Sequence, residues 1–488
     1  MSLTELSGPP MPEESTPAEP STPPARRSSP FGALLVRLHF YAGILVAPFL
    51  VVAALTGLAY TVAPQVDGAL YGDRLTVDAR GERPLPLADQ IAAARAAHPT
   101  GSVATVQPGD GDRTTRVAFA LPELGEKVHT VYVDPYTAEV RGQLTTWFGS
   151  TPATTWLDDL HRNLHLGVVG RHYSELAASW LWVLALGGLL LWWRRRRASR
   201  SAARHLFVPN LSTARGVRRT RGWHATTGVW LVVGLLFLSV TGLTWSRYAG
   251  ATFGAGLDAL DARSPEISTS LTAVPAETGG GHHHGDAPAH RVVDPAAFDR
   301  VLGAARTAGL SGPVEMTPAA EPGTAWTVTQ IDNTWPVAKD RVAVDPTGGT
   351  ITARSDFADW PLLAKLSGLG IQAHMGVLFG PVNQILLAAL ALGLLCVVVW
   401  GYRMWWQRRP TRADRRAPVG APPARGGVRR LPLWAVLLGA AVTVAVGWAL
   451  PLFGLSLLAF LAVDVLAGVA SRRRRTGSMP VSPAPAGS

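Results

Sequence analysis

Long apolar runs constrain this chain more than any other feature of its sequence. Four of them extend from about Leu34 to Val62, Leu176 to Trp193, Trp223 to Trp245 and Pro381 to Trp400. Each is long enough to cross roughly 30 Å of hydrocarbon as a helix that rises about 1.5 Å per residue. The stretch from Leu431 to Ala470 is roughly twice one span, and Pro451 near its middle predicts a helical hairpin. The sequence therefore predicts an α-helical integral membrane protein with six transmembrane helices, a four-helix core followed by a C-terminal hairpin.

Arginine clusters beside these runs indicate how the helices are oriented. They include Arg194 to Arg197 after the second run, Arg215 to Arg221 before the third, and Arg472 to Arg475 after the hairpin. The net charge of +11 is compatible with nucleic-acid binding, but positive charge at the ends of apolar runs favours a topology signal. All of these arginine clusters can lie in the cytoplasm only if the chain crosses the membrane an even number of times. We therefore expect both termini in the cytoplasm, two long segments outside it, and no nucleic-acid partner.

The runs and clusters divide the chain into successive parts. We expect a disordered cytoplasmic tail (1–33), a first span (34–62), an outer segment (63–160), an outer histidine segment with the second span (161–194), a basic loop (195–221), a third span (222–246), a second outer segment (247–365), a second histidine segment with the fourth span (366–407), a cytoplasmic linker (408–430), the hairpin (431–470) and a cytoplasmic tail (471–488). The first run begins too late and is too long for a cleaved signal peptide, so we expect an uncleaved anchor.

The two halves of the core carry a duplicated pattern. The first and third runs share a histidine, a glycine four residues later and a Thr-Gly-Leu tripeptide at identical spacing: His39, Gly43 and Thr56 to Leu58 in one, His224, Gly228 and Thr241 to Leu243 in the other. The second and fourth runs follow His165-Leu-Gly-Val and His374-Met-Gly-Val. The outer segments repeat as well, since VYVDPYTAEV resembles VAVDPTGGTI and each follows a helical stretch. We therefore expect two helix-plus-sheet modules above two helix pairs.

These motifs resemble the PepSY-associated transmembrane helix family. The similarity lies in the LHFYAG and WHATTG helix starts, the LHRNLHLG and AHMGVLFG segments and the VDP-type strands, and it covers roughly Leu34 to Trp406. It implies a multi-pass protein of the bacterial inner membrane with two extracytoplasmic α+β PepSY-like modules, of a family often tied to iron acquisition. One branch of the family consists of haem-containing ferric-siderophore reductases.

The repeated histidines suggest a cofactor. An ionisable residue in a membrane segment indicates a functional site, and imidazole is a common axial ligand of haem iron. We predict two haems with His39, His224, His165 and His374 as axial ligands. Glycines that would leave room for the porphyrin planes are Gly43, Gly228, Gly167 and Gly376. The chain has one cysteine, Cys396, and no Cys-x-x-Cys-His motif, so the haems would be non-covalent b-type groups. The alternative is that these are interfacial histidines bonded to backbone, with glycines that serve helix packing.

The duplication also predicts which histidines share a haem. His39 and His224 would lie at the cytoplasmic side, and His165 and His374 at the outer side. A porphyrin roughly 10 Å wide cannot bridge about 30 Å of hydrocarbon, which excludes a haem shared by His39 and His165. His161, four residues before His165, is an alternative ligand or a propionate contact, and His172 is a weaker candidate of the same kind.

Two functions compete on this evidence. The first is a transmembrane electron conduit, which takes electrons from an unknown cytoplasmic donor and reduces a ferric chelate or another extracytoplasmic acceptor. The second is a non-enzymatic membrane protein whose modules bind a peptide, a protein or a metal. The tract His282, His283 and His284 is compatible with metal capture, although its glycine-rich setting favours a linker. Apart from the lipid bilayer no partner is identified, and a homo-oligomer is left open.

Overall fold

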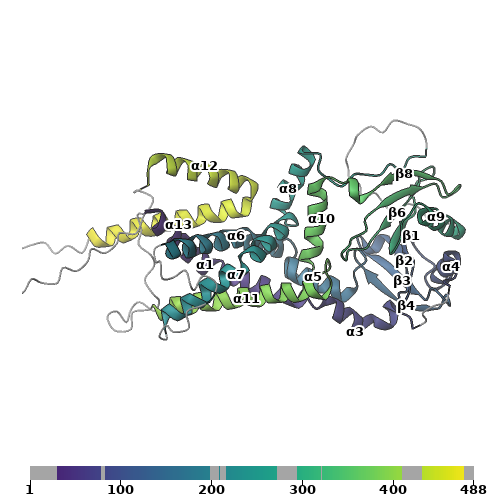
Figure 1. Cartoon of the computed structure of the whole chain (residues 1–488), viewed down its shortest axis with the longest axis horizontal. Helices are drawn as coiled ribbons and strands as arrows, with labels where there is room; N and C mark the ends of the chain where they lie inside the picture. Colours follow the sequence, from purple (N-terminus) through teal and green to yellow (C-terminus); the bar gives the residue numbers. More distant parts are fainter. Residues whose placement is uncertain are drawn as a thin grey trace, which may run out of the picture.

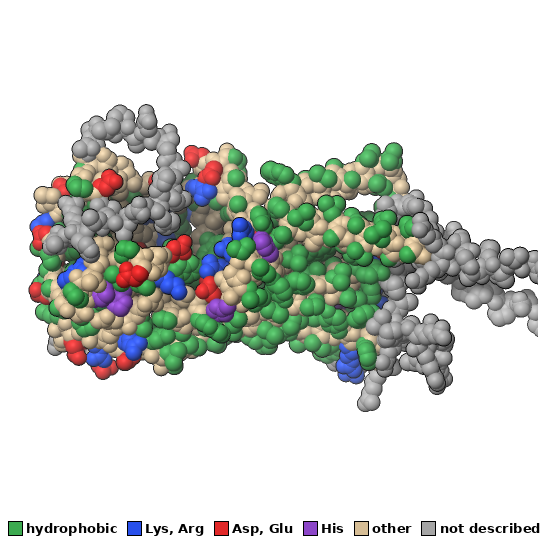
Figure 2. All heavy atoms as spheres, turned by 180° about the vertical axis from the view of Figure 1, so that it is seen from behind, with side chains coloured by type: hydrophobic (Ala, Val, Ile, Leu, Met, Phe, Trp, Pro, Cys, Tyr) green, Lys and Arg blue, Asp and Glu red, His purple; other side chains and the backbone are tan. Residues whose placement is uncertain are grey.

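The computed structural model describes residues 30–78, 83–197, 208, 216–271, 294–319, 321–408 and 431–476. The tail expected to be disordered lies outside this part except for its last residues, and so does the tract from His282 to His284. Long helices form one half of the molecule and a sheet with two covering helices forms the other (Figure 1). Apolar side chains cover the helical half, whereas acidic and basic side chains gather over the sheet half (Figure 2). This division is typical of a membrane protein with one water-exposed domain.

Five helical segments among the described residues are long and apolar enough to cross a membrane. They are Ala47–Leu75, Gly167–Arg197, Val217–Thr244, Pro381–Gln407 and Pro451–Ala470. The first joins α2 (Ala47–Tyr60) to α3 (Ala63–Leu75), and the others correspond to α6 (Gly167–Arg197), α7 (Val217–Thr244), α11 (Pro381–Gln407) and the first part of α13 (Pro451–Thr476). Two shorter apolar helices are α1 (Pro30–Leu45) and α12 (Leu433–Ala449). The chain is therefore a multi-pass helical membrane protein, with five segments of spanning length in its described part compared with the six crossings predicted.

The first apolar run was predicted as one helix, and the structure divides it between α1 and α2. Pro48 follows the break and has no N–H with which to bond the carbonyl of Ile44. The hydroxyl of Tyr402, on α11, donates to that carbonyl over 3.0 Å. A backbone acceptor freed within an apolar environment thus keeps a donor, as the absence of water there requires.

The helical half has its own buried core. Small residues of α1 and α2, including Ala42 and Ala54, pack against Ala177 and Trp180 of α6, with Leu235 of α7 close by. The hairpin joins this core at its edge. As predicted, Pro451 lies at the turn, because α12 ends at Ala449 and α13 begins at Pro451.

The outer segments form a single antiparallel sheet. Its strands are β1 (Ser102–Gln107), β2 (Thr115–Ala120), β3 (Val128–Val133), β4 (Val140–Thr146), β5 (Val314–Thr317), β6 (Trp326–Gln330), β7 (Arg341–Val344) and β8 (Ile351–Ser355). The order is β4-β3-β2-β1-β5-β6-β7-β8, so each outer segment contributes four consecutive strands. The two sets meet at the centre, where Val106 of β1 pairs with Met316 of β5. The prediction of two modules is refined, because they share one sheet.

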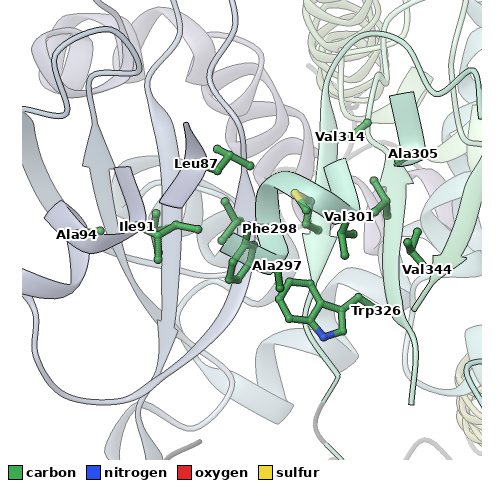
Figure 3. Packing of buried hydrophobic residues seen from close by; sticks show 14 of the residues in the cluster. Leu87, Ile91, Ala94, Ala297, Phe298, Val301, Ala305, Val314, Trp326 and Val344 are labelled. Carbon is green, nitrogen blue, oxygen red and sulfur yellow. The ribbon is translucent and has the colours of Figure 1, made fainter. Parts of the chain in front are cut away.

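Helices α4 (Leu87–Ala97) and α9 (Pro295–Thr307) join the two sets further. Leu87 and Ile91 of α4 belong to the same buried cluster as Phe298 and Val301 of α9 (Figure 3). The carboxylate of Asp299 accepts hydrogen bonds from the backbone N–H groups of Leu87 and Ala88 at the start of α4, over 2.7 and 2.9 Å. The second module therefore completes the start of α4 in the first, and the two modules share one core.

Short helices connect the sheet to the spanning helices. They are α3, α5 (Pro152–Asn163), α8 (Tyr248–Ala259) and α10 (Leu362–His374). Asp67 of α3 accepts hydrogen bonds from the hydroxyls of Thr151 and Thr154, which stand at the start of α5. This contact fixes α5 at the boundary between the two halves, and α5 carries one of the candidate histidines.

Candidate functional site

The structure brings two pairs of histidines together. His39 of α1 and His224 of α7 have ring centres 6.3 Å apart, and the rings are nearly perpendicular. His161 of α5 and His374 of α10 have ring centres 6.4 Å apart, with 42° between the planes. We call these the inner pair and the outer pair, after the sides on which the arginine clusters and the sheet lie. Each pair joins one histidine from each half of the duplication.

Glycines leave room for the rings of the inner pair. A Cβ at Gly187 of α6 would lie 3.5 Å from Nδ1 of His39, and one at Gly188 would lie 3.3 Å from its Cε1. A Cβ at Gly401 of α11 would lie 3.7 Å from Cε1 of His224. The histidines therefore point into the bundle against the faces of neighbouring helices that carry no side chain.

A backbone carbonyl orients one of the two inner rings. Nδ1 of His224 donates to the carbonyl of Val397 over 2.9 Å, one turn before Gly401. Nδ1 of His39 lies near the backbone of Leu184, one turn before Gly188, but forms no hydrogen bond of regular geometry. When Nδ1 carries the proton, the lone pair lies on Nε2, the atom available to a metal.

Threonine hydroxyls orient both rings of the outer pair. The hydroxyl of Thr56 donates to the carbonyl of Val52 over 2.8 Å, so its oxygen is left to accept from Nδ1 of His161, 2.9 Å away. In the other half, the hydroxyl of Thr241 donates to its own helix over 2.7 Å and its oxygen lies 2.7 Å from Nδ1 of His374. A hydroxyl whose proton is already used requires the ring to be the donor. Both outer histidines thus carry the proton on Nδ1 and present Nε2.

The glycine after each threonine lies beside the same ring. A Cβ at Gly57 would lie 3.1 Å from Cε1 of His161, and one at Gly242 would lie 3.7 Å from Cε1 of His374. The repeated Thr-Gly dipeptide therefore has two functions, since the threonine holds the imidazole and the glycine admits it. The sequence displayed this dipeptide at equal spacing in both halves, but its contact with a histidine on another segment was not predicted.

The outer pair has a neutral charge state. His161 and His374 lie on α5 and α10, outside the spanning helices, and burial lowers the pKa of each imidazole to about 4. Both rings are therefore uncharged near pH 7. Neutral imidazole is the form that binds metals.

A cavity of about 230 Å³, counted as the space open to the centres of water molecules, lies beside the outer pair. Its inner wall is apolar and includes small residues. Residues of this wall are Leu50, Ala53, Ala54, Ala177, Ala178, Leu181, Leu235, Leu238, Leu387, Leu390, Ala391 and Leu394. Arg162, Arg171, Asp158 and Glu175 also line it. The cavity is therefore amphipathic, with an apolar part within the bundle and a charged part near the outer helices.

The charged residues of this cavity are held by specific contacts. Arg162 forms ion pairs with Asp158 and Asp159 on its own helix. Arg171 donates to the carbonyl of Trp245 over 2.9 Å. Glu175, which is 1% exposed, accepts from two backbone N–H groups at the start of α8. Two guanidinium groups with fixed positions would suit the carboxylates of a ligand.

Two predicted histidines lie elsewhere. His165 is exposed and packs on Trp156, with ring centres 4.9 Å apart. It is turned away because α5 ends at Asn163 and both Leu164 and His165 have a positive φ of 55°. The ring beside His374 is that of His161, which the sequence offered only as an alternative. His172 stacks on Tyr248 and belongs to neither histidine pair.

The predicted glycines are also not those beside the rings. A Cβ at Gly43 would touch only Leu184, at 4.0 Å, and one at Gly228 would meet nothing within 4 Å. Gly167 and Gly376 have φ values of +55° and +83°, so they serve the turns before the spanning helices. In the described part of the chain, no group of three or more His, Cys, Asp and Glu side chains is arranged to hold a metal ion.

Comparison with known proteins gives one finding. A family model described as the PepSY-associated TM region matches residues 36–408. The match includes all four histidines of the two pairs and ends before the C-terminal hairpin. No curated protein matches the chain.

Proposed function

The chain belongs to the PepSY-associated transmembrane family, and on this basis we propose that it is a transmembrane electron conduit with two non-covalent b-type haems. His39 and His224 would hold the inner haem, and His161 and His374 the outer one. The single observation that carries this proposal is the repeated spacing of the two pairs, 6.3 and 6.4 Å between ring centres.

The spacing agrees with coordination of one metal by two imidazoles. A bond between a metal and an imidazole nitrogen is about 2 Å long. The ring centre lies beyond the nitrogen, so two imidazoles that held one metal would have centres up to roughly 6 Å apart. Nδ1 of each outer histidine and of His224 is occupied by a hydrogen bond, which leaves Nε2 as the coordinating atom.

The surroundings of the outer pair also fit a haem. The apolar wall of the cavity would contact a porphyrin, and Arg162 and Arg171 would contact its propionates. When bound, haem supplies one-electron transfer at a potential set by its ligands and surroundings. The residues of the chain fix the ligands, exclude water from the apolar part of the site and set the separation between the two haems.

The proposal also includes an assignment of the helices to six membrane crossings. Helices α1 and α2 together form the first crossing, α6, α7 and α11 form the next three, and α12 and α13 form the last two. Both termini then lie in the cytoplasm of a bacterium, and the sheet lies outside the inner membrane. Haem held by the inner and outer pairs would supply one-electron transfer between a cytoplasmic donor and an acceptor near the sheet.

The acceptor class that this arrangement suits is a ferric chelate such as a siderophore. Transfer of one electron converts Fe³⁺ to Fe²⁺, which hard oxygen ligands bind less strongly, and the iron is released. The rival function is a PepSY protein that binds a peptide, protein or metal without redox chemistry. A protein with this second function would not bind haem in a fixed ratio of haem to chain.

Reconstitution tests the conduit directly. Vesicles that contain the purified protein would be loaded with a membrane-impermeant reductant, and a ferric chelate would be added outside. We expect the haem absorption to become reduced and external Fe²⁺ to appear, and a His224→Ala variant should produce no Fe²⁺ above protein-free vesicles. Equal rates with the wild type, the variant and empty vesicles would refute electron transfer through the protein.

A further inference from the structure

The C-terminal helix α13 is attached to α1 by two contacts one helical turn apart. Arg37 forms an ion pair with Asp464; the side chain of Arg37 is 10% exposed and that of Asp464 is 29% exposed. Tyr41, one turn further along α1, packs on Phe460, one turn earlier on α13, with ring centres 5.6 Å apart. The two helices therefore run antiparallel, and this contact joins the core to a segment beyond the family match.

A second set of contacts attaches α13 to α6. The indole N–H of Trp180 donates to the hydroxyl of Ser456 over 2.9 Å. The ring of Phe453 packs on Trp180 and Trp182, with centres 4.9 and 5.8 Å apart. Charged and polar groups in an apolar environment need fixed partners, so these contacts specify one position of α13 against the bundle.

The face of α1 opposite the ion pair carries the inner histidine. Residues two apart on a helix point about 200° away from each other, so Arg37 and His39 lie on opposite faces. Leu35 shares the face of His39, and a Cβ at Gly187 of α6 would lie 3.8 Å from Leu35 and 3.5 Å from His39. Helix α1 thus lies between α13, which contacts Arg37 and Tyr41, and α6, which contacts Leu35 and His39.

We propose that Asp464 is a positioning residue for the inner pair. Its ion pair with Arg37 fixes the rotation of α1 about its axis, and this rotation directs His39 toward His224. Without Asp464, Arg37 loses the ion pair that links α1 to α13, and the loss of an ion pair by a buried charge is costly. The rotation of α1 then relaxes and the distance between the two histidines is no longer fixed. Only the effect on haem rests on the function proposed above.

A cross-link measures the rotation of α1 whether or not haem is present. The background is Cys396→Ser, with Leu35→Cys and Gly187→Cys as the reporter pair and a membrane-permeant oxidant. We expect a high yield of disulfide, a severalfold lower yield with Asp464→Leu, and recovery with the exchange Arg37→Asp and Asp464→Arg. Asp258→Leu, which removes an exposed ion pair with Arg263, should leave the yield unchanged. An unchanged yield with Asp464→Leu, or no recovery in the exchange variant, would overturn the proposal.

The haem spectrum provides the second measurement. In the full-length protein without cysteine substitutions, Asp464→Leu should alter the absorption of the component that His224→Ala removes and leave the other component unchanged. The exchange variant should restore it. An inner component identical to that of the wild type would overturn the positioning role. If the wild type binds no haem, the conduit is refuted, whereas the cross-link still decides whether Asp464 positions α1.

Discussion

At each outer histidine a threonine hydroxyl fixes which ring nitrogen carries the proton. Thr56 lies 105 residues before His161, and Thr241 lies 133 residues before His374. Their equal spacing from His39 and His224 is visible in the sequence, but a contact over such distances along the chain is not. The sequence also could not show which of His161 and His165 lies beside His374, because this depends on where α5 ends. Leu164 adopts a left-handed conformation that leucine does not favour. The sequence therefore contained no signal that α5 ends at Asn163.

Removal of the threonine oxygen tests this role. Thr56→Val and Thr241→Val delete the acceptor for Nδ1 and keep the shape of the side chain. We expect the affinity for the outer haem to fall by about 10- to 100-fold, as for other groups that orient a metal ligand. Thr443→Val is the matched control, because that hydroxyl bonds its own helix at an exposed position. Haem titration of the apoprotein measures the effect, and equal affinities in all three variants would contradict it.

The two glycines beside the outer rings predict unequal effects. In Gly57→Ala the new Cβ would lie 3.1 Å from His161, which forces the ring to move by a few tenths of an ångström. In Gly242→Ala the corresponding distance is 3.7 Å, an ordinary contact. We expect the first variant to shift the spectrum of the outer haem and the second to resemble Gly439→Ala, whose Cβ meets nothing. A larger effect of Gly242→Ala would show that the ring geometry is wrong.

At the scale of elements, the pairing of strands in the outer segments could not be predicted from the sequence. The alternating VYVDP and VAVDP stretches predicted strands, and these are β3 and β7. Alternation does not state which edges pair, however, and the junction between β1 and β5 rests on one residue pair. The shared core of α4 and α9 was not predicted either. Its members are ordinary apolar residues whose partners belong to a segment more than 200 residues away along the chain.

Asp299 provides a test of the joined modules. Asp299→Ala removes the acceptor for the first two N–H groups of α4, which lie in the other module. We expect a loss of about 1 to 2 kcal/mol in the local stability of α4, typical for a helix-capping group. Hydrogen exchange of the amides of Leu87 and Ala88 in the full-length protein should accelerate accordingly. Unchanged exchange at these amides would show that Asp299 does not stabilise the start of α4.

At the scale of the whole molecule, the membrane character followed from the apolar runs. The structure adds an independent argument on topology, because strands from both outer segments pair in one sheet. Both segments must then lie on the same side of the membrane, and an even number of crossings must separate them. Helices α6 and α7 provide those two crossings. The arginine clusters predict the same even number of crossings from charge alone, and they further predict that both segments lie outside the cytoplasm.

Reporter fusions test this topology. Fusions after Asp110 and Gly323 should report a location outside the cytoplasm, and fusions after Arg215 and Gly420 a location inside it. The reason is that the first two sites lie in the sheet half and the others beside arginine clusters. Opposite locations for Asp110 and Gly323 would be incompatible with one sheet.

The ratio of haem to protein in single histidine variants tests the central claim most directly. We expect two haems per chain in the wild type. His39→Ala and His224→Ala should lose the same spectral component, and His161→Ala and His374→Ala should lose the other. His165→Ala is the matched control and should keep both components. Loss of the outer haem in His165→Ala with retention in His161→Ala would contradict the outer pair, and unchanged haem content in all five variants would contradict the conduit itself.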